Sequence, residues 1–269
     1  MAGEDRLKNA AAPDPTGTDN YSPAQMAQRV EAAGVTKAGL ALHKLVMLAL
    51  LAGVFIAFGA ALYTAVIAGA DPLTGPLRLL GGLAFSLGLI LVVVGGAELF
   101  TGNALIVMAW ADGKVSSSAL LRNWAIAYLG NAAGGIALAL LVLASGILDA
   151  GPARGTAIAI AEAKMHLAFV PAFFRGVLCN MLVCLAVWLC FAARGVTGKI
   201  LAILFPISAF VALGFEHSIA NFYFVPLGLM LGAEGGLAGM AANLVPVTLG
   251  NIAGGAGGVA AVYWVIYRR

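Results

Sequence analysis

The stretch Gly95-Gly96-Ala97-Glu98-Leu99-Phe100-Thr101-Gly102-Asn103 interrupts a long apolar segment with glycines, a carboxylate and an amide. A similar pattern returns in the second half of the chain, where Gly214-Phe215-Glu216 is followed by Asn221. The glutamate and the asparagine both recur 118 positions later. Ionisable and amide groups are costly inside apolar segments and usually mark a functional pathway. The repeated pattern therefore indicates where such a pathway lies.

A second repeated motif indicates that the chain is an internal duplication. Each half carries an asparagine, then a Gly-Asn pair, then a Gly-Gly pair, and the offset between the halves is 120 positions. These residues are Asn123, Gly130-Asn131 and Gly134-Gly135, and in the second half Asn243, Gly250-Asn251 and Gly254-Gly255. Two independent motifs with nearly the same offset predict two related halves.

The composition is that of a membrane protein. Of the 269 residues, 62% are hydrophobic and only 10% are charged, whereas a soluble domain carries roughly 25% charged residues. A water-exposed globular domain is therefore excluded. The formal net charge of +3 is not arranged as a basic stripe interleaved with aromatic residues, so nucleic-acid binding is not predicted.

Six apolar stretches are long enough to cross a bilayer, which takes about 20 residues. They lie near residues 40–69, 77–111, 121–147, 166–192, 199–231 and 243–267. Three spans in each repeat insert the second half upside down relative to the first. The prediction is an all-α membrane protein with a six-span transport domain over 37–269, built from inverted three-helix repeats at about 37–150 and 160–269.

The second and fifth spans are too long and too interrupted to be single helices. Non-helical backbone is tolerated in a membrane only where it is buried in protein or lines a cavity. Paired broken helices in inverted halves indicate a substrate site near the middle of the membrane. The N-termini of half-helices carry positive partial charge, which suits an anion.

Basic residues predict the orientation, because 11 of the 15 fall on one side of the predicted membrane. The positive-inside rule then places both termini in the cytoplasm. Residues 1–36 are expected to form a polar cytoplasmic segment. Within it, Ser22-Pro23 is typical of a helix start, and we expect a short interfacial helix over about 23–33 with Val30 and Ala33 facing apolar surface.

His217 is the candidate with the clearest chemistry. It lies in the break of the fifth span, between Glu216 and Ser218 and one helical turn before Asn221. A buried imidazole donates a hydrogen bond to an anion, and its unperturbed pKa of about 6.5 allows proton exchange near neutral pH. The alternative is a core histidine satisfied by neighbouring carbonyls. The duplication and the helix break favour the functional interpretation.

Other polar residues are weaker candidates. Lys164 opens the fourth span, where it attracts anions or is an ordinary snorkelling lysine. Thr101 has a hydroxyl in the first break, although such hydroxyls often bond their own backbone. Asn180 needs a polar partner in its apolar span, and His217 is a plausible neighbour. Negative charge makes Glu98, like its equivalent in the second half, a poor anion ligand, and we expect both carboxylates to brace the broken backbone by accepting N–H bonds.

Six large apolar residues near the breaks are candidates for a constriction: Phe85, Leu89, Leu99, Phe100, Val183 and Phe210. Apolar side chains around a narrow path gate it by dewetting. On the residues alone, ordinary packing is the better explanation.

Several functional classes are disfavoured. Cys179, Cys184 and Cys190 lack metal-ligand spacing and are expected to pack as small residues. Motifs of hydrolases and zinc enzymes are absent, so we expect neither an enzyme nor a metal or other cofactor. An aquaporin-type channel for neutral solutes has the same span count, but its two Asn-Pro-Ala boxes are missing.

Longer motifs resemble the formate/nitrite transporter family over about residues 35–267. They are Ala97–Asn103, Phe174–Asn180 with Leu182–Trp188, Gly214–Asn221, Asn243–Gly255 and Tyr263–Tyr267. The resemblance implies an aquaporin-like protomer in a homopentamer within the lipid bilayer, expected in the bacterial cytoplasmic membrane. It also implies passage of formate, nitrite, acetate, lactate or hydrosulfide.

The resemblance also implies roles for individual residues. His217 matches the central histidine of the family, Lys164 the vestibule lysine, Thr101 the loop threonine, and Asn180 and Asn221 polar pathway residues. The six apolar candidates match two constrictions, which favours gating over simple packing.

The mechanism that we expect is proton-linked. Lys164 and the half-helix ends concentrate the anion, and His217, directly or through water, supplies a proton so that a neutral acid passes the apolar constrictions. A passive channel in which His217 only donates a hydrogen bond is the alternative. Motifs of the formate and nitrite branches are mixed, and we expect formate first and nitrite next.

Overall fold

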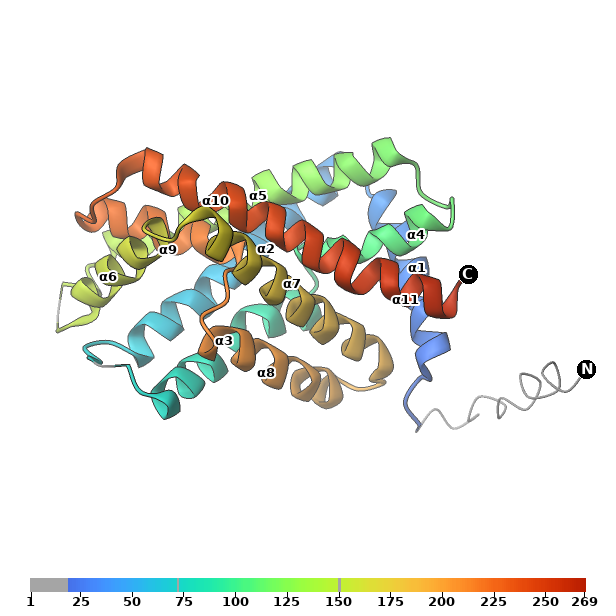
Figure 1. Cartoon of the computed structure of the whole chain (residues 1–269), viewed down its shortest axis with the longest axis horizontal. Coiled ribbons are helices and arrows are strands. Elements are labelled where there is room, and N and C mark those ends of the chain that lie inside the picture. The colour runs from blue at the N-terminus through green and yellow to red at the C-terminus, as the bar shows by residue number, and fades with distance from the viewer. Residues whose placement is uncertain (1–18, 72, 150) are drawn as a thin grey trace, which may run out of the picture.

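A computed structural model describes residues 19–71, 73–149 and 151–269, and over these residues the regular secondary structure is entirely helical. Half of the predicted N-terminal segment, residues 1–18, lies outside the described residues. The helices form one elongated bundle, in which α6 lies at one end of the long axis and α1 at the other (Figure 1).

Within the described residues, five helical stretches are long and apolar enough to cross a membrane. They are α2 (Leu42–Val66), α3 (Gly75–Gly95), α5 (Ser117–Ala144), α7 (Phe169–Ala192) and a continuous stretch over Gly236–Tyr267. The last comprises α10 (Gly236–Ile252), the π-helical segment η2 (Ala253–Ala261) and α11 (Val262–Tyr267). Four of the predicted spans are therefore continuous helices, as expected.

The second predicted span is broken in its middle, where the sequence predicted it. Helix α3 ends at Gly95, and the chain turns at Gly96, whose φ is +84°. The helix resumes as a 3-10 turn, η1 (Gly102–Ile106), and a short α4 (Val107–Ala111). Glycine adopts positive φ at little cost because it has no Cβ, which explains its presence at this turn.

The fifth predicted span is broken in the same way. Helix α8 (Val196–Ala212) ends before Gly214, whose φ is +72°, and α9 (Ser218–Leu231) follows after three further residues. Both breaks therefore have a glycine with positive φ two residues before a glutamate.

A buried asparagine braces the first break. Asn131 of α5 donates from Nδ2 to the carbonyls of Ala49 at 2.7 Å and Glu98 at 2.9 Å. Its Oδ1 accepts the backbone N–H of Phe100 at 2.9 Å. One side chain thus satisfies the carbonyl of Glu98 and the N–H of Phe100 in the break, which a membrane interior requires, and links the break to α2 through Ala49.

Asn251 of α10 braces the second break with the same pattern. Its Nδ2 donates to the carbonyls of Gly176 at 2.8 Å and Glu216 at 2.9 Å, and its Oδ1 accepts the N–H of Ser218 at 2.9 Å. Asn251 is fully buried, as is Asn131. The 120-residue repeat of the sequence therefore recurs as a repeat of hydrogen bonds.

Two further helices flank the bundle, and the sequence analysis missed one of them. The expected helix over 23–33 is confirmed as α1 (Pro23–Ala38), which is five residues longer and starts with a capping box at Ser22. The segment between the third and fourth predicted spans, for which the sequence analysis predicted no helix, holds α6 (Ala153–Met165). Because α6 has only 13 residues, it is too short to give the signal of a spanning helix.

The apolar side of α1 packs on protein. Val30 is 2% exposed and lies in a cluster with Met26, Ile106 and Met108, so η1 and α4 supply the apolar surface that the sequence predicted. Ala33 is half-buried.

Charged groups at this end of the molecule attach α1 to the C-terminus. Glu31 of α1 is 4% exposed and accepts hydrogen bonds from Lys114 and, at 2.5 Å, from Arg268. These bonds raise the pKa of the Lys114 ammonium and of the Arg268 guanidinium. The hydrogen bond from the Trp264 indole N–H lowers the pKa of the Asp112 carboxyl most, and the hydrogen bond from Lys114 lowers it further. Lys114, Arg268 and Asp112 therefore keep their charges over a wider pH range.

Replacing Asn251 with alanine is expected to destabilise the fold, because it removes the hydrogen-bond partner of the Glu216 carbonyl and the Ser218 N–H at the break and a further bond to the carbonyl of Gly176. An unsatisfied buried polar group costs about 1–3 kcal/mol, so we expect a loss of at least about 2 kcal/mol and a lower melting temperature in detergent. Thr36→Ala, which removes one exposed hydrogen bond, is the control. Equal melting temperatures for the two variants would show that Asn251 does not hold the break.

Candidate functional site

His217 lies at the second break and is the N-cap residue of α9. Its Nδ1 accepts the backbone N–H of Ala220 at 3.1 Å, and its Nε2 lies 3.0 Å from Oγ1 of Thr101. Because an accepting Nδ1 carries no hydrogen, the neutral ring carries its hydrogen on Nε2 and donates it to Thr101. The hydroxyl hydrogen of Thr101 is then free to point elsewhere.

The two broken helices meet at this contact. Thr101 precedes η1 at the first break and is fully buried, and His217 is 3% exposed. Asn180 of α7 donates to the backbone carbonyl of Thr101 at 3.2 Å and to that of Asn251 at 2.7 Å. Asn180 therefore finds its polar partners in the backbone beside the breaks, and among the described residues it makes no hydrogen bond to His217.

A polar network anchors the second break from the α6 end. The ammonium of Lys164 lies 2.9 Å from Oε1 of Glu216. Asn221 donates to Oε2 of Glu216 at 2.7 Å, and Asn243 donates to the backbone carbonyl of Lys164 at 2.9 Å. The structure thus brings Lys164, Glu216 and Asn221 together, as partners of one another.

The first break has the same network at the α1 end. Lys37 lies 2.6 Å from Glu98, Asn103 donates to Glu98 at 2.8 Å, and Asn123 donates to the carbonyl of Lys37 at 3.1 Å. The sequence analysis missed Lys37 as the counterpart of Lys164. Both lysines lie near the end of a short helix just before a spanning helix, but this pair is 127 positions apart, so it does not follow the offset of the other motifs.

The two carboxylates were expected to accept N–H bonds. Glu98 and Glu216 accept them from asparagine amides and lysine ammonium groups. The backbone N–H groups beside the breaks are bonded instead by Asn131 and Asn251. The carboxylates therefore compensate buried or half-buried cations.

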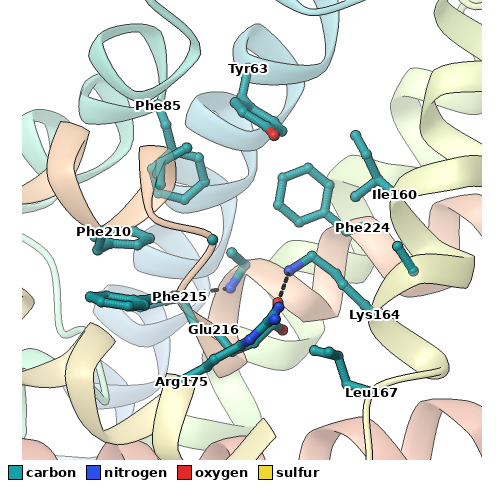
Figure 2. Close-up of a pocket in the computed structure, with 15 residues that line it drawn as sticks. Tyr63, Phe85, Ile160, Lys164, Leu167, Arg175, Phe210, Phe215, Glu216 and Phe224 are labelled. Atoms are coloured by element: carbon teal, nitrogen blue, oxygen red, sulfur yellow. Dashed lines mark hydrogen bonds and ion pairs between the residues drawn. The ribbon is translucent and has the colours of Figure 1, made fainter. Parts of the chain in front are cut away.

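A cavity of about 200 Å³ lies at the second break (Figure 2). Its polar lining is Lys164, Arg175, Glu216, His217 and Tyr63, and aromatic and aliphatic residues form the rest. Figure 2 shows Lys164 extended toward Glu216, with the ring of Phe224 close to its ammonium. The ammonium is 5.3 Å from the centre of that ring.

A second cavity, of about 510 Å³, lies at the first break. Its charged lining is Arg29 and Lys37 from α1, Glu98, and Lys199 from α8. Arg29 also lies over the ring of Tyr21 at 3.9 Å. Because α1 lines this cavity and α6 lines the other, the two cavities face opposite ends of the molecule (Figure 1).

Four of the apolar side chains predicted for a constriction line the two cavities, two in each. The rings of Phe85 and Phe210 pack edge to face, with their centres 5.5 Å apart, and both line the first cavity. Phe210 also stacks on His217, with ring centres 5.9 Å apart. Leu89, one turn further along α3, and Leu99 line the second cavity.

Some predicted site residues lie away from both cavities. Phe100 packs its ring against Tyr128 at 4.9 Å, and Val183 is 1% exposed in the core. Asn180 and Asn221 likewise belong to the bracing network and line neither cavity. The sequence analysis also missed cavity residues: Tyr63, Arg175, Phe224, Arg29, Lys37 and Lys199. In the sequence, only their charge or aromatic character, together with their position in the repeat, could have indicated that these residues line a cavity.

Known proteins resemble this chain over nearly its whole length. The family model for formate/nitrite transporters matches residues 24–265. A probable formate transporter of Methanothermobacter thermautotrophicus is 41% identical over 272 residues, which cover 94% of this chain and 99% of that protein. The formate channel FocA of Escherichia coli is 39% identical over 273 residues, covering 93% and 96%.

Solved structures share the fold. A pentameric formate channel with formate bound matches with a TM-score of 0.77 and 43% identity, covering 85% of this chain and 98% of that one. An FNT family ion channel matches with a TM-score of 0.84 and 30% identity, covering 90% and 98%. These matches confirm the resemblance seen in the motifs, and the chain belongs to the formate/nitrite transporter family.

Proposed function

We propose that this protein moves small monovalent weak-acid anions across a membrane, with formate as the first substrate and nitrite as the next. The observation that carries the proposal is the contact of Thr101 with His217, 3.0 Å long, between two cavities that face opposite ends of the molecule. Acetate, lactate and hydrosulfide belong to the same proposed class. We propose no enzymatic activity, because the relatives are transporters and channels.

Positive charge in both cavities supports an anionic substrate. Lys164 and Arg175 line the first cavity, and Arg29, Lys37 and Lys199 line the second. Each cavity contains one glutamate, and a lysine neutralises it. Clefts lined by one sign of charge raise the local concentration of the opposite ion.

The apolar side chains that line both cavities support passage as a neutral acid. A bare anion pays a large desolvation penalty when it leaves water for an apolar ring. Desolvation also raises the pKa of a carboxylic acid, so protonation becomes easier along the path. We propose that His217, directly or through water, supplies the proton beside the Phe85–Phe210 ring pair.

The hydrogen bonds of His217 predict a structural change during such a transfer. A ring that releases a proton from Nε2 must first be doubly protonated, and it then keeps a hydrogen on Nδ1. That nitrogen can no longer accept the N–H of Ala220, so the N-cap bond of α9 must open. A proton relay through the ring is therefore coupled to the first turn of α9.

A passive anion channel is the second candidate. It is favoured by the same hydrogen bonds, because a neutral His217 already donates from Nε2 while its Nδ1 caps α9. In that case Thr101 and His217 offer hydrogen bonds to the anion and no cap bond opens.

His217→Asn separates the two candidates. An asparagine still caps α9 and still donates a hydrogen bond, but it does not titrate. For a proton relay, we expect formate-driven proton uptake into liposomes with an internal pH dye to fall at least about 100-fold, since positioned acids contribute that much. Nitrite is measured in the same way.

His43→Asn, on the exposed start of α2, is the matched control and should keep the wild-type rate. Unchanged rate and unchanged proton coupling in His217→Asn would exclude the relay. Anion current without proton uptake in the wild type would establish the passive channel instead.

We propose that Phe85 and Phe210 form a constriction at the first cavity, and that Leu89 and Leu99 form one at the second. Phe100 and Val183, predicted for the same role, line neither cavity, and we propose that they pack against the residues that do.

Phe210→Ala removes a ring that contacts both Phe85 and His217. We expect lactate flux relative to formate flux to rise several-fold in liposomes, because the narrow apolar path widens. An unchanged ratio would show that this ring does not select by size.

We propose an aquaporin-like architecture of six spans in two inverted repeats. Equivalent residues of the two halves touch: Tyr128 and Thr248, 120 positions apart, share a hydrogen bond of 2.9 Å. Such a contact is expected beside a pseudo-two-fold axis. The equivalent helices α1 and α6 lie at opposite ends, which supports an axis in the membrane plane (Figure 1). The division into an N-terminal segment over 1–36 and a transport domain over 37–269 stays a prediction.

We also propose a homopentamer in a bacterial cytoplasmic membrane with both termini in the cytoplasm. The solved pentameric relative and the basic residues near both termini support this. Native mass spectrometry should show an assembly five times the 27.3 kDa chain mass. A C-terminal tag should resist protease added to intact spheroplasts. A monomer, or a tag cleaved from outside, would contradict the corresponding part of the proposal.

A further inference from the structure

The positive charge of Lys164 in the first cavity is already compensated. Its ammonium lies 2.9 Å from Glu216, and the two side chains are only 15% and 6% exposed. Glu216 is further held by Asn221 at 2.7 Å. An ion pair so enclosed contributes a dipole to the cavity and almost no net charge.

Arg175 lines the same cavity and has no such partner. Among the described residues, its guanidinium makes no ion pair and no hydrogen bond, and the residue is exposed. Its position is nevertheless fixed, because its backbone carbonyl accepts the N–H of Glu216 at 3.2 Å. Figure 2 draws Arg175 among the residues that line this cavity, together with the Lys164–Glu216 pair.

Arg175 therefore supplies the uncompensated positive charge of this cavity. It stands on α7, which begins at Phe169, so it lies in the second turn of a spanning helix. A charged residue at this depth faces a water-filled cavity or reaches for the headgroups. The cavity that Arg175 lines offers the first alternative.

The geometry of a guanidinium adds selectivity to charge. It presents parallel N–H groups in a rigid plane, which match the two oxygens of a carboxylate in a bidentate contact. Formate and nitrite both carry two oxygens on one central atom. A spherical anion such as chloride has no second acceptor, and a lysine ammonium has no fork.

From this arrangement we propose that Arg175 is the anion-binding and specificity-determining residue of the first cavity, and that it selects planar anions with two oxygens. The inference rests on the proposed function. It assigns to Lys164 the task of holding the break through Glu216, and to Arg175 the capture of the substrate before it reaches the Phe85–Phe210 ring pair.

The test is competition against formate uptake in liposomes, with nitrite and chloride as the competitors. In the wild type, nitrite should inhibit at a much lower concentration than chloride. Arg175→Lys keeps the charge and loses the fork, so the inhibition constant of nitrite should rise about tenfold, which corresponds to about 1.4 kcal/mol. That of chloride should stay within about twofold, because the charge is retained. Arg175→Gln should weaken both competitors.

Arg154→Gln is the matched control, since Arg154 lies at the same end of the molecule, is 51% exposed and pairs with Asp149. It should leave both inhibition constants unchanged. Wild-type inhibition that does not distinguish nitrite from chloride would overturn the proposal, and this measurement needs no variant. Unchanged constants in both Arg175 variants, or equal losses for the two anions in Arg175→Lys, would also overturn it. Absence of formate uptake by the wild type would instead contradict the proposed function.

Discussion

The structure depends on two buried asparagine side chains that replace the hydrogen bonds lost where spanning helices break. A bilayer interior offers no water to exposed backbone groups, so a break needs partners from within the protein. Asn131 and Asn251 each supply two donors and one acceptor to three backbone groups around a glutamate. Removing either amide leaves two backbone groups of a break without their hydrogen-bond partner. The breaks, and hence the position of His217 opposite Thr101, are possible only because these two amides are in place.

The two lysine–glutamate pairs extend the same logic from hydrogen bonds to charge. Lys37–Glu98 and Lys164–Glu216 stand at the two breaks, each with asparagines on the carboxylate and on the lysine carbonyl. Removing one member of a buried pair leaves an unpaired charge, which is far more damaging than the pair itself is stabilising. The pairs therefore fix α1 and α6 against the breaks, and the charge available to a passing anion must come from other residues.

Much of this scaffold could be predicted from the sequence, because it rests on residue types that are rare in apolar segments. Glycines, asparagines and glutamates at constant offsets indicated both breaks and the duplication. The short helix α6 gave no such signal, because its 13 residues cannot span a membrane. Lys37 was missed because the loops before the breaks differ in length between the halves. The roles of Phe100, Asn180 and Asn221 depend on side-chain direction, which spacing along the chain does not determine.

The duplicated scaffold carries chemistry that is not duplicated. With the 118-residue offset of the breaks, His217 corresponds to Leu99 and Thr101 corresponds to Ile219. The histidine and the threonine thus come from opposite halves and meet at 3.0 Å, while their equivalents are apolar. Phe85 and Phe210 likewise come from different halves, and their equivalents are Ile203 and Val92. The repeated residues therefore stabilise two matched breaks in the backbone. The residues that differ between the halves place one hydrogen-bonded pair, His217 and Thr101, and one ring pair, Phe85 and Phe210, between these breaks. An exact repeat would give two identical breaks with either two histidines or none, and a single central donor requires that the halves differ there.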